Sequence, residues 1–378
     1  MSSRNSYDAV FIGAGIIGLA CAWRAAERGL SVLVLERDEP GSGASGVAAG
    51  MLAPVTEADF GEERLLGANL ESRALWPGFA AELEQRTGLS TGYSESGALV
   101  VAADRDDAEE LRRLHELHRS LGLETEWLTP SACRAQEPGL SPRIGGGILV
   151  PQDAHADPRA TVGALAAALE LAGGELESGT EVVGLESAGG RVTGVRTAGG
   201  KVAAGQVVLA AGCWSGEGIE TGAALPPVRP VKGQLLELRV RPGRPAPAQR
   251  IVRSPRCYLL SRGDGRVVLG ATVEEQGFDT AVTADGIYRL LEAAWEVLPD
   301  VSELELVQAR AGLRPGTPTG EPMIGAAEPE GLVLATGHYR NGVLLAPLTA
   351  DAVAGLLAGD PLPASVAGFA PGTAEVGA

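Results

Sequence analysis

Three glycines and one acidic residue near the N-terminus have the types and spacing of a dinucleotide-binding turn. Gly13, Gly15 and Gly18 form the pattern G-x-G-x-x-G, and Glu36 stands at the end of the next apolar run. The first glycine allows a tight turn, the second lets a pyrophosphate approach the backbone, and the third lets a helix pack closely on a strand. The phosphates then meet free N–H groups at the positive end of a helix dipole. A carboxylate at Glu36 would accept hydrogen bonds from an adenosine ribose and repel a 2′-phosphate, so the pattern disfavours NADP.

The elements that must position this turn lie on either side of it. Residues 8–12 predict a buried parallel strand, residues 19–29 have helical composition and end at a glycine, and residues 31–35 form a second apolar run. A glycine-rich structural turn is the alternative, but it would leave Glu36 without a role. Residues 37–54 are rich in Gly, Ala and Ser and become apolar toward their end. This composition favours a bulky flavin laid against backbone over a flexible linker.

A second set of residues has the chemistry needed to hold a small carboxylic acid. Arg314 follows an apolar run at residues 304–313 and precedes a proline–glycine turn, so it can point into a cleft. The planar fork of an arginine matches a carboxylate. Tyr258, in a strand predicted over residues 257–262, would add a hydroxyl to the same carboxylate. A surface ion pair for Arg314 and a core position for Tyr258 are the alternatives.

No general base is obvious, because the chain has only four histidines. Hydride transfer to the ring of a bound flavin requires no base. The turn at residues 337–342 opens a helix predicted to run to about residue 357. Its N–H groups and dipole would stabilise the negative charge of a reduced flavin, as an oxyanion hole does. Simple helix capping would also explain this turn.

The other histidines have structural interpretations. His115 and His118 lie in the sequence HELH, which is not the zinc motif H-E-x-x-H, and they are expected on a solvated helix face. His155 is expected to be a loop histidine bonded to backbone, although it could also line a site.

The rest of the chain alternates between nucleotide-binding and antiparallel signatures. Nucleotide-binding patterns occur near residues 7–54, 150–215 and 320–357, and antiparallel strand patterns lie between them. The chain is therefore predicted to leave one cofactor-binding domain and re-enter it. Helices are predicted over residues 65–87, 106–121, 159–172 and 284–298, and a capped helical turn over 129–138. Asp157 and Pro158 are expected to cap the helix at 159–172. Strands are predicted over residues 97–103, 175–185, 191–196, 201–203, 206–211, 233–240, 257–262, 266–272, 304–313 and 332–335.

The composition excludes several classes of function. A net charge of −17 over 378 residues argues against nucleic acid and anionic membrane surfaces as partners. The first residues are too short and too weakly basic for a signal peptide, and the apolar run after them is broken by glycines. The four cysteines, Cys21, Cys133, Cys213 and Cys257, form no C-x-x-C pair, so we expect no disulfide framework, no metal site and a cytoplasmic location.

Five segments together resemble the D-amino acid oxidase family of flavoenzymes. They are GAGIIG with Glu36, SGVAAGML at residues 45–52, VVLAAGCWS at 207–215, AGLRPGTPTGEPMIG at 311–325 and LVLATGHYRNGVLLAP at 332–347. The resemblance implies an α/β fold with a Rossmann-type FAD-binding domain and an inserted antiparallel-sheet (α+β) substrate domain. The predicted boundaries are residues 1–85, 150–222 and 315–370 for the FAD-binding domain, 86–149 and 223–314 for the substrate domain, and 371–378 for a loose tail.

The resemblance also implies the reaction. The expected cofactor is noncovalent FAD, and the expected reaction is oxidative deamination of glycine and other small amino acids, such as sarcosine and small D-amino acids. Oxygen would be reduced to hydrogen peroxide, and the imine of glycine would supply the thiazole of thiamine. The resemblance further suggests a homotetramer.

Site residues follow from the matching segments. Arg314, Tyr258 and Arg340 would border the substrate, with Arg314 on its carboxylate. Val273 and Arg256 depart from the methionine and the histidine that occur at these places in the family, and these departures would change the shape of the pocket. FAD contacts are expected at Gly13, Gly15, Ile16, Ile17, Gly18, Glu36, Arg37, Ala44, Ser45, Ala49, Gly50, Met51, Val182, Gly212, His338, Tyr339, Arg340, Asn341, Gly342, Val343 and Leu344.

Two other functions compete with this one. The first is an FAD dehydrogenase for D-amino acids or proline that passes electrons to a quinone or carrier, which the sequence barely separates from an oxidase. The second is an FAD-containing scaffold or tRNA-modification partner without turnover. The charge of −17 weighs against tRNA, and an arginine–tyrosine pocket weighs against a scaffold.

Overall fold

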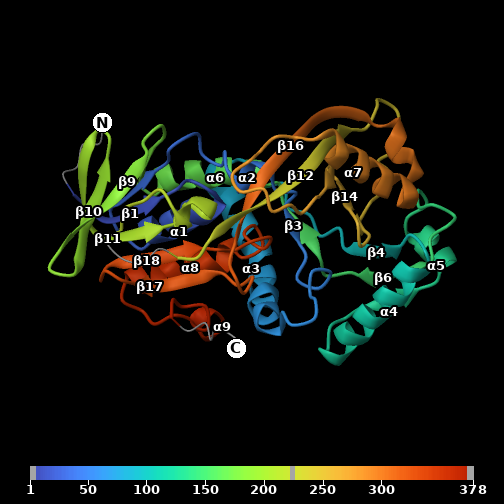
Figure 1. Ribbon diagram of the computed structural model, residues 1–378, viewed down its shortest axis with the longest axis horizontal. Coiled ribbons are helices and arrows are strands. Elements are labelled where there is room, and N and C mark those ends of the chain that lie inside the picture. The colour runs from blue at the N-terminus through green and yellow to red at the C-terminus, as the bar shows by residue number, and fades with distance from the viewer. Residues whose placement is uncertain (1–5, 222–225, 373–378) are drawn as a thin grey trace.

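The computed structural model describes residues 6–221 and 226–372. Within this part of the chain, two eight-stranded sheets stand side by side, with a two-stranded sheet near their junction (Figure 1). The domain boundary predicted between residues 222 and 223, and the predicted loose tail beyond residue 372, lie outside the described residues.

The first sheet is parallel at its centre. Strands β18, β11, β1, β2 and β8 pair in parallel, and every residue of β2 and β18 is buried. Burial on both faces explains why these strands read as unbroken apolar runs. The sheet has the order β17 (Met323–Ala327), β18 (Leu332–Thr336), β11 (Gly200–Leu209), β1 (Ser6–Ile12), β2 (Val32–Leu35) and β8 (Glu175–Glu177), and β10 (Arg191–Thr197) and β9 (Val182–Ala188) continue from β11 in antiparallel pairing.

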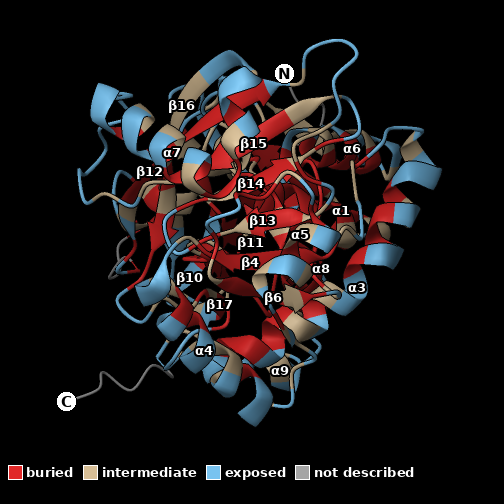
Figure 2. Cartoon of the chain, turned by 90° about the vertical axis from the view of Figure 1, so that its right-hand side faces the viewer, coloured by how far each residue is buried: buried red, intermediate tan, exposed pale blue. Residues whose placement is uncertain are grey.

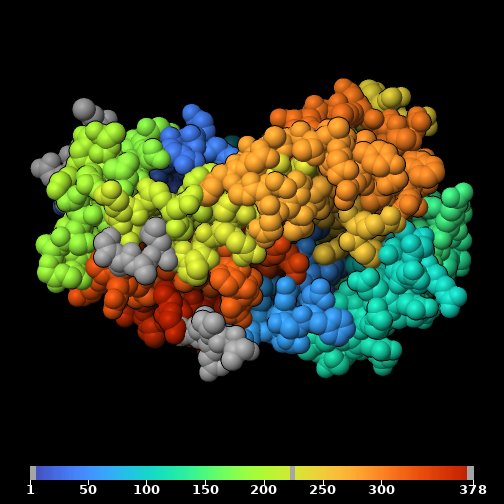
Figure 3. All heavy atoms as spheres, viewed as in Figure 1, coloured from blue at the N-terminus to red at the C-terminus, as the bar shows by residue number. Residues whose placement is uncertain are grey.

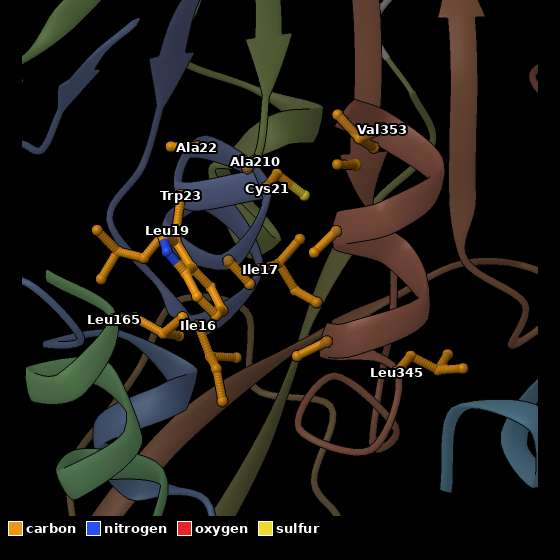
Figure 4. Packing of buried hydrophobic residues seen from close by; sticks show 14 of the residues in the cluster. Ile16, Ile17, Leu19, Cys21, Ala22, Trp23, Leu165, Ala210, Leu345 and Val353 are labelled. Atoms are coloured by element: carbon orange, nitrogen blue, oxygen red, sulfur yellow. The ribbon is translucent and has the colours of Figure 1, made fainter. Parts of the chain in front are cut away.

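Helix α1 (Ile16–Glu27) begins directly after the glycine turn and packs between α6 (Pro158–Leu171) and α8 (Ala346–Leu357). In Figure 4, Leu19 and Trp23 of α1 face Leu165 of α6, whereas Cys21 lies on the side of α8. The predicted cap of α6 is confirmed, because the Asp157 side chain accepts hydrogen bonds from two backbone N–H groups of the first turn.

The second sheet is antiparallel except for one pair. Strand β13 runs parallel to β4 and so joins two parts of the chain that are far apart in sequence. Figure 2 shows its buried strands enclosed by helices whose outer faces are exposed. The order is β16 (Glu305–Gly316), β12 (Arg229–Arg239), β15 (Arg266–Gly270), β14 (Tyr258–Ser261), β13 (Ile251–Arg253), β4 (Ala98–Ala102), β6 (Gly146–Val150) and β5 (Glu126–Leu128).

The remaining elements cover or connect these sheets. Helices α4, α5 and α7 pack on the second sheet, whereas α3, near the middle of Figure 1, packs on α6 and α8 of the first half. Their bounds are α3 (Glu63–Thr87), α4 (Arg105–Ser120), α5 (Pro130–Gln136) and α7 (Ala284–Val297), and the short elements are α2 (Ala44–Val47), β3 (Met51–Leu52), β7 (Ala154–His155), α9 (Ala364–Ala367) and the 3₁₀ helices η1 (Gly212–Gly216) and η2 (Pro299–Glu303).

Several local predictions were wrong. The strands predicted at 201–203 and 206–211 are one strand, β11, whereas the strand predicted at 175–185 is divided into β8 and β9. Arg314 lies within β16 and not after it, because the antiparallel pairing with β12 continues to Gly316. Helix α8 begins at Ala346 and not at the turn, because residues 342–345 form further turns first.

Two histidine predictions were also wrong. His118 is fully buried and not solvated, because that side of α4 faces residues 56–60, where its Nε2 lies 3.3 Å from the Ala58 carbonyl. His155 belongs to strand β7, whose backbone pairs with Met51 of β3 and with Ser94. Its ring is buried, and Nδ1 has no hydrogen-bond partner in the described residues.

Candidate active site

A cavity of about 570 Å³ runs from the glycine turn to the second sheet. Its lining includes residues at the carboxyl ends of β1, β2, β11 and β18, where open α/β sheets bind their ligands. Most of the predicted site residues line this one cavity. Gly18, Asn341 and Leu344 lie behind it: Gly18 in the packing of the turn, the other two in the segment that leads into α8.

The nucleotide end is formed by backbone. Gly13 has a φ of +105°, and a Cβ there would lie 2.6 Å from the Ala210 carbonyl oxygen, while a Cβ on Gly18 would lie 2.0 Å from the Gly13 oxygen. Both contacts require glycine, so the turn brings the start of α1 up to the cavity. Ile16 N–H donates to the Ser45 hydroxyl (3.0 Å), and the N–H groups of Gly15 and Ile17 have no acceptor among the described residues.

Glu36 is fixed between two loops. Its Oε2 accepts a hydrogen bond from Ala14 N–H (2.7 Å), and its Oε1 accepts one from Asp38 N–H (2.9 Å). The carboxylate lines the cavity and keeps lone pairs for a ligand. Nearby, the Arg37 guanidinium lies 4.6 Å from the centroid of the Trp214 ring, which also lines the cavity. Trp214 was not predicted as a site residue, although it lies in the segment at residues 207–215 that resembles the family.

The middle of the cavity is lined by residues 44–51, whose backbone is held by arginines. Arg159 Nε (2.9 Å) and Arg310 Nη1 (2.5 Å) donate to the Gly46 carbonyl, and Arg262 Nη2 donates to the Ala49 carbonyl (2.7 Å). Gly50 has a φ of +82°, and a Cβ there would lie 2.1 Å from the Ala156 oxygen. The small residues seen in the sequence are therefore needed for close backbone packing, whereas the anchoring arginines were missed.

Five residues of the segment 338–344 line another wall of the cavity: His338, Tyr339, Arg340, Gly342 and Val343. His338 is 2% exposed, its Nε2 lies 3.0 Å from Thr349 Oγ1, and burial lowers its pKa to about 3, so it is neutral at pH 7. Tyr339 has a φ of +47° and donates its N–H to the Pro315 carbonyl. The N–H groups of Gly342 and Val343 have no acceptor in the described part of the chain. These donors stand at the N-terminal approach of α8, where negative charge is stabilised.

The substrate end brings together Arg314 from β16 and Tyr258 from β14. Arg314 Nη1 donates to the carbonyls of Lys232 (3.2 Å) and Thr272 (3.1 Å), and no carboxylate of a described residue forms an ion pair with it. Burial raises the pKa of Tyr258 to about 12, although Arg314 acts in the opposite direction. At neutral pH the pair therefore presents a guanidinium and a hydroxyl donor to the cavity, and the surface ion pair considered for Arg314 is not seen in the described residues.

Arg340 lines the same cavity but is neutralised. Its Nη2 lies 2.6 Å from Glu62 Oε2, and its Nε lies 3.6 Å from Glu57 Oε2. Glu57 also pairs with Arg253 (3.0 Å), and its side chain is only 12% exposed at the cavity wall. Glu57 was not predicted, because it lies on an irregular segment between β3 and α3 that has no periodic pattern.

The rim of the cavity carries the two departures from the family pattern. Val273 is 65% exposed there, and Arg256 is paired with Glu296 of α7. Among the described residues, no helix has the length and apolar character needed to cross a membrane.

Comparisons with known proteins agree with this geometry. A family model described as FAD dependent oxidoreductase (DAO) matches residues 8–356. The chain is 36% identical to a glycine oxidase of Geobacillus kaustophilus strain HTA426 over 93% of each chain. It is also 38% identical to a bifunctional protein ThiO/ThiG of Trichormus variabilis, over 92% of this chain but 52% of that protein, so it spans about half of that relative.

Solved structures of amino acid-oxidising flavoenzymes also resemble this chain. The crystal structure of glycine oxidase from Geobacillus kaustophilus superposes with a TM-score of 0.92 at 35% identity, covering 99% of this chain and all of the other. An iminodiacetate oxidase from Chelativorans sp. BNC1 superposes with a TM-score of 0.84 at 26% identity, covering 96% of this chain and 98% of the other.

Proposed function

Because the chain belongs to the FAD dependent oxidoreductase (DAO) family, we propose that it binds FAD noncovalently and oxidises glycine and other small amino acids, sarcosine and small D-amino acids among them. The amino acid is converted to an imine, which water hydrolyses to a 2-oxo acid and ammonia, and oxygen is reduced to hydrogen peroxide. The observation that carries this proposal is Arg314: a guanidinium without a carboxylate partner in the described residues, in the cavity that begins at the nucleotide turn.

The residues present fit FAD. The glycine turn and the N–H groups of Gly15 and Ile17 would hold the pyrophosphate, and Glu36 would hold the ribose. The ring would lie along residues 44–51 and 338–344. When bound, the flavin supplies the hydride acceptor for the reaction.

The chain's own side chains hold and orient the substrate. Arg314 binds the carboxylate with the N–H groups that it does not give to backbone, and Tyr258, protonated at neutral pH, donates to the same group. His338 is neutral and bonded to Thr349, so it is not placed as a general base. The N–H groups of Gly342 and Val343 would stabilise negative charge in the cavity during the reaction.

The relatives favour an oxidase over the alternatives. Relatives at 31–36% identity over most of both chains are named glycine oxidase, and oxidases also stand among the solved structures. The L-proline dehydrogenase from P. horikoshii is 24% identical and shares the fold. No relative reported above is a tRNA-modification protein or a scaffold.

The wider setting follows from the same relatives. We propose that the imine of glycine supplies the thiazole of thiamine, because relatives at 36–38% identity are named bifunctional protein ThiO/ThiG. All four cysteines are free and buried, which fits the reducing cytoplasm. The homotetramer stays a prediction of the family resemblance.

The test uses the purified holoprotein. Glycine in air should produce hydrogen peroxide, and anaerobic glycine should bleach the flavin absorbance. Acid precipitation should leave the yellow colour in the supernatant, as expected of noncovalent FAD. Anaerobic bleaching and dye reduction without peroxide would indicate the dehydrogenase, and no bleaching by any small amino acid would refute the proposed function.

A further inference from the structure

A lysine is completely buried beneath the substrate end of the cavity. Lys232, on β12, is 1% exposed, and its Nζ lies 2.7 Å from Asp279 Oδ2 and 3.8 Å from Glu274 Oε2. Both carboxylates belong to residues 271–283, the irregular segment that connects β15 to α7. A lysine is rarely buried without a paired charge, and both partners of this ammonium lie on the same segment.

The backbone and a second side chain reinforce the same contact. The N–H and carbonyl of Lys232 pair with the carbonyl and N–H of Glu274, both at 2.9 Å. Gln234, two residues along β12, donates from Nε2 to Glu274 Oε1 (2.8 Å) and accepts from Thr283 N–H (2.8 Å). Two residues of β12 therefore hold Glu274: Lys232 by an ion pair and backbone hydrogen bonds, and Gln234 by a side-chain hydrogen bond.

The clasped segment forms part of the cavity wall. Ala271 and Val273 line the cavity, directly before the residue that Lys232 holds. In Figure 3, the orange part of the chain, which includes residues 271–283 and α7, forms a surface mass that reaches toward the middle of the molecule. A displacement of this segment would therefore alter the substrate end of the cavity and not its nucleotide end.

The link to the substrate runs through Arg314. Its Nη1 donates to the carbonyls of Lys232 and Thr272, one from each of the two segments that the ammonium holds together. The guanidinium lies over Gly233, where a Cβ would be 2.3 Å from both Nη atoms. Nε and Nη2 form no hydrogen bond with the described residues, so they are left for a ligand.

We propose that Lys232 is a positioning residue for substrate binding. Its ammonium holds residues 271–283 on β12, so that the carbonyls of Lys232 and Thr272 stay together and aim the free edge of Arg314 at the substrate carboxylate. Without the ammonium, the carboxylates of Glu274 and Asp279 lose their shared cation and the two carbonyls separate. This inference rests on the proposed function, because it assigns Arg314 the substrate carboxylate.

The decisive variant is Lys232→Met, which keeps much of the side-chain volume and removes the charge. We expect KM for glycine to rise by about 10- to 100-fold, since a misplaced binding group costs on the order of 10²-fold, while kcat stays within about threefold. The dissociation constant for acetate, measured by titrating the flavin absorbance, should rise in parallel. FAD affinity should not change, and Lys232→Arg should restore part of the loss.

A matched control joins the same strand, β12, to the same segment, residues 271–283. Arg229 pairs with Glu275 at 3.0 Å, but both side chains are more than half exposed. Arg229→Met should leave KM and the acetate constant within about twofold of wild type, because exposed ion pairs contribute little. A loss in Arg229→Met equal to that in Lys232→Met would refute a specific role for the buried ammonium.

The failure of this inference is separable from that of the proposed function. If wild type does not oxidise glycine, the proposed function fails, and acetate binding still tests Lys232. If Lys232→Met is folded and yellow with unchanged KM and acetate affinity, the positioning role is wrong. Should Lys232→Met not fold, Asp279→Asn removes the half-exposed partner instead, and it should raise both constants about 3- to 10-fold; unchanged constants in that variant would refute the proposal.

Discussion

The two ends of the cavity reach their geometry by different routes. At the nucleotide end, the ligand-facing groups are backbone N–H donors and one carboxylate, all within residues 13–45. At the substrate end, they are side chains from three distant elements: Arg314 on β16, Tyr258 on β14 and Arg340 before α8. The first arrangement requires only one strand–turn–helix–strand unit and the loop after it, whereas the second requires that the antiparallel sheet be complete and in register.

This difference predicts how each end responds to mutation. Backbone donors cannot be deleted by a side-chain substitution, so the nucleotide end should weaken in steps as single contacts are lost. The substrate end depends on one guanidinium held by two carbonyls, so a single substitution there should remove most of the function.

Arg314→Ala should have the largest effect. One partner of a desolvated charge pair would be lost, which costs on the order of 3–5 kcal/mol, so kcat/KM for glycine should fall by about 10²–10⁴-fold while FAD stays bound. Arg314→Lys should recover only part, because a point charge does not reproduce the fork. Steady-state kinetics and the flavin spectrum provide the measurements.

Arg340→Ala is the comparison for this variant. Arg340 lines the same cavity but already carries Glu62 and Glu57 as partners, so its loss should reduce kcat/KM less than the loss of Arg314. If Arg314→Ala oxidised glycine within about threefold of wild type, Arg314 would not be the clamp, and Arg340 or Arg256 would be the next arginine to test.

Glu36→Ala should have the next largest effect, confined to the nucleotide end. The loss of a charge-assisted hydrogen bond costs on the order of 1.5–3 kcal/mol, or roughly 10- to 150-fold in FAD affinity. At saturating FAD, kcat should stay within about threefold of wild type. Glu39→Ala, an exposed neighbour, is the control and should bind FAD normally. A collapse of kcat in saturated Glu36→Ala would contradict the separation of the two ends.

Gly233→Ala tests whether space beside the guanidinium matters. The new Cβ would lie 2.3 Å from both Nη atoms of Arg314, and the end of a flexible side chain can move away without unfolding the sheet. We therefore expect a fall in kcat/KM of about 10- to 100-fold, carried mainly by KM, with little change in melting temperature. Gly263→Ala, where a Cβ would meet no atom within 4 Å, should be neutral in both measurements. A normal KM in Gly233→Ala would show that Arg314 tolerates displacement.

The same contrast explains what the sequence could predict. The glycine turn, Glu36 and both flanking strands were predicted because their positions follow from neighbours in the chain. Arg314 and Tyr258 were predicted as residue types beside one pocket. The residues that hold these side chains in place were not predicted. The Lys232 carbonyl, for example, accepts a hydrogen bond from Arg314 because β12 pairs with β16, and pairing between strands so far apart in sequence cannot be derived from periodicity.

The burial of single polar residues was also not predicted from the sequence. Helix α4 is strongly amphipathic, and His118 follows Leu111 by seven residues, so it lies on the buried face of the helix, where the spacing alone could have placed it. Its Nε2 lies 3.3 Å from the Ala58 carbonyl, in the irregular residues 56–60. Glu57 lies on the same irregular segment. Such segments have no period from which an inward side can be read, so the packing around them appears only in the three-dimensional structure.

The smallest expected effect concerns the junction of the two ends, where His155 of β7 pairs with Met51 of β3. Burial, with Arg262 adding to it and Asp157 opposing it, lowers the pKa of His155 from 6.5 to about 4. Between these values the unfolded chain binds a proton that the native protein does not, so the native state loses stability as the pH falls. Replacing this ring should therefore make the protein less sensitive to acid.

His155→Leu removes this titratable group. The substitution breaks no hydrogen bond at Nδ1, because this nitrogen of His155 has no partner among the described residues. Between pH 7.5 and about 5.5, the free energy of unfolding should fall by about 1.4 kcal/mol less in His155→Leu than in wild type, measured in urea at one FAD concentration. Leu52→Ala, in the neighbouring strand β3, is the control, because it loses packing but should keep the full pH dependence of wild type. The histidines at 118 and 338 remain in both variants, and their lowered pKa values contribute equally to each measurement. If His155→Leu had the same pH dependence as wild type, the His155 ring would bind its proton in the native protein as readily as in the unfolded chain. The buried junction between the two ends of the cavity would then accept a charged imidazole, which contradicts the lowered pKa.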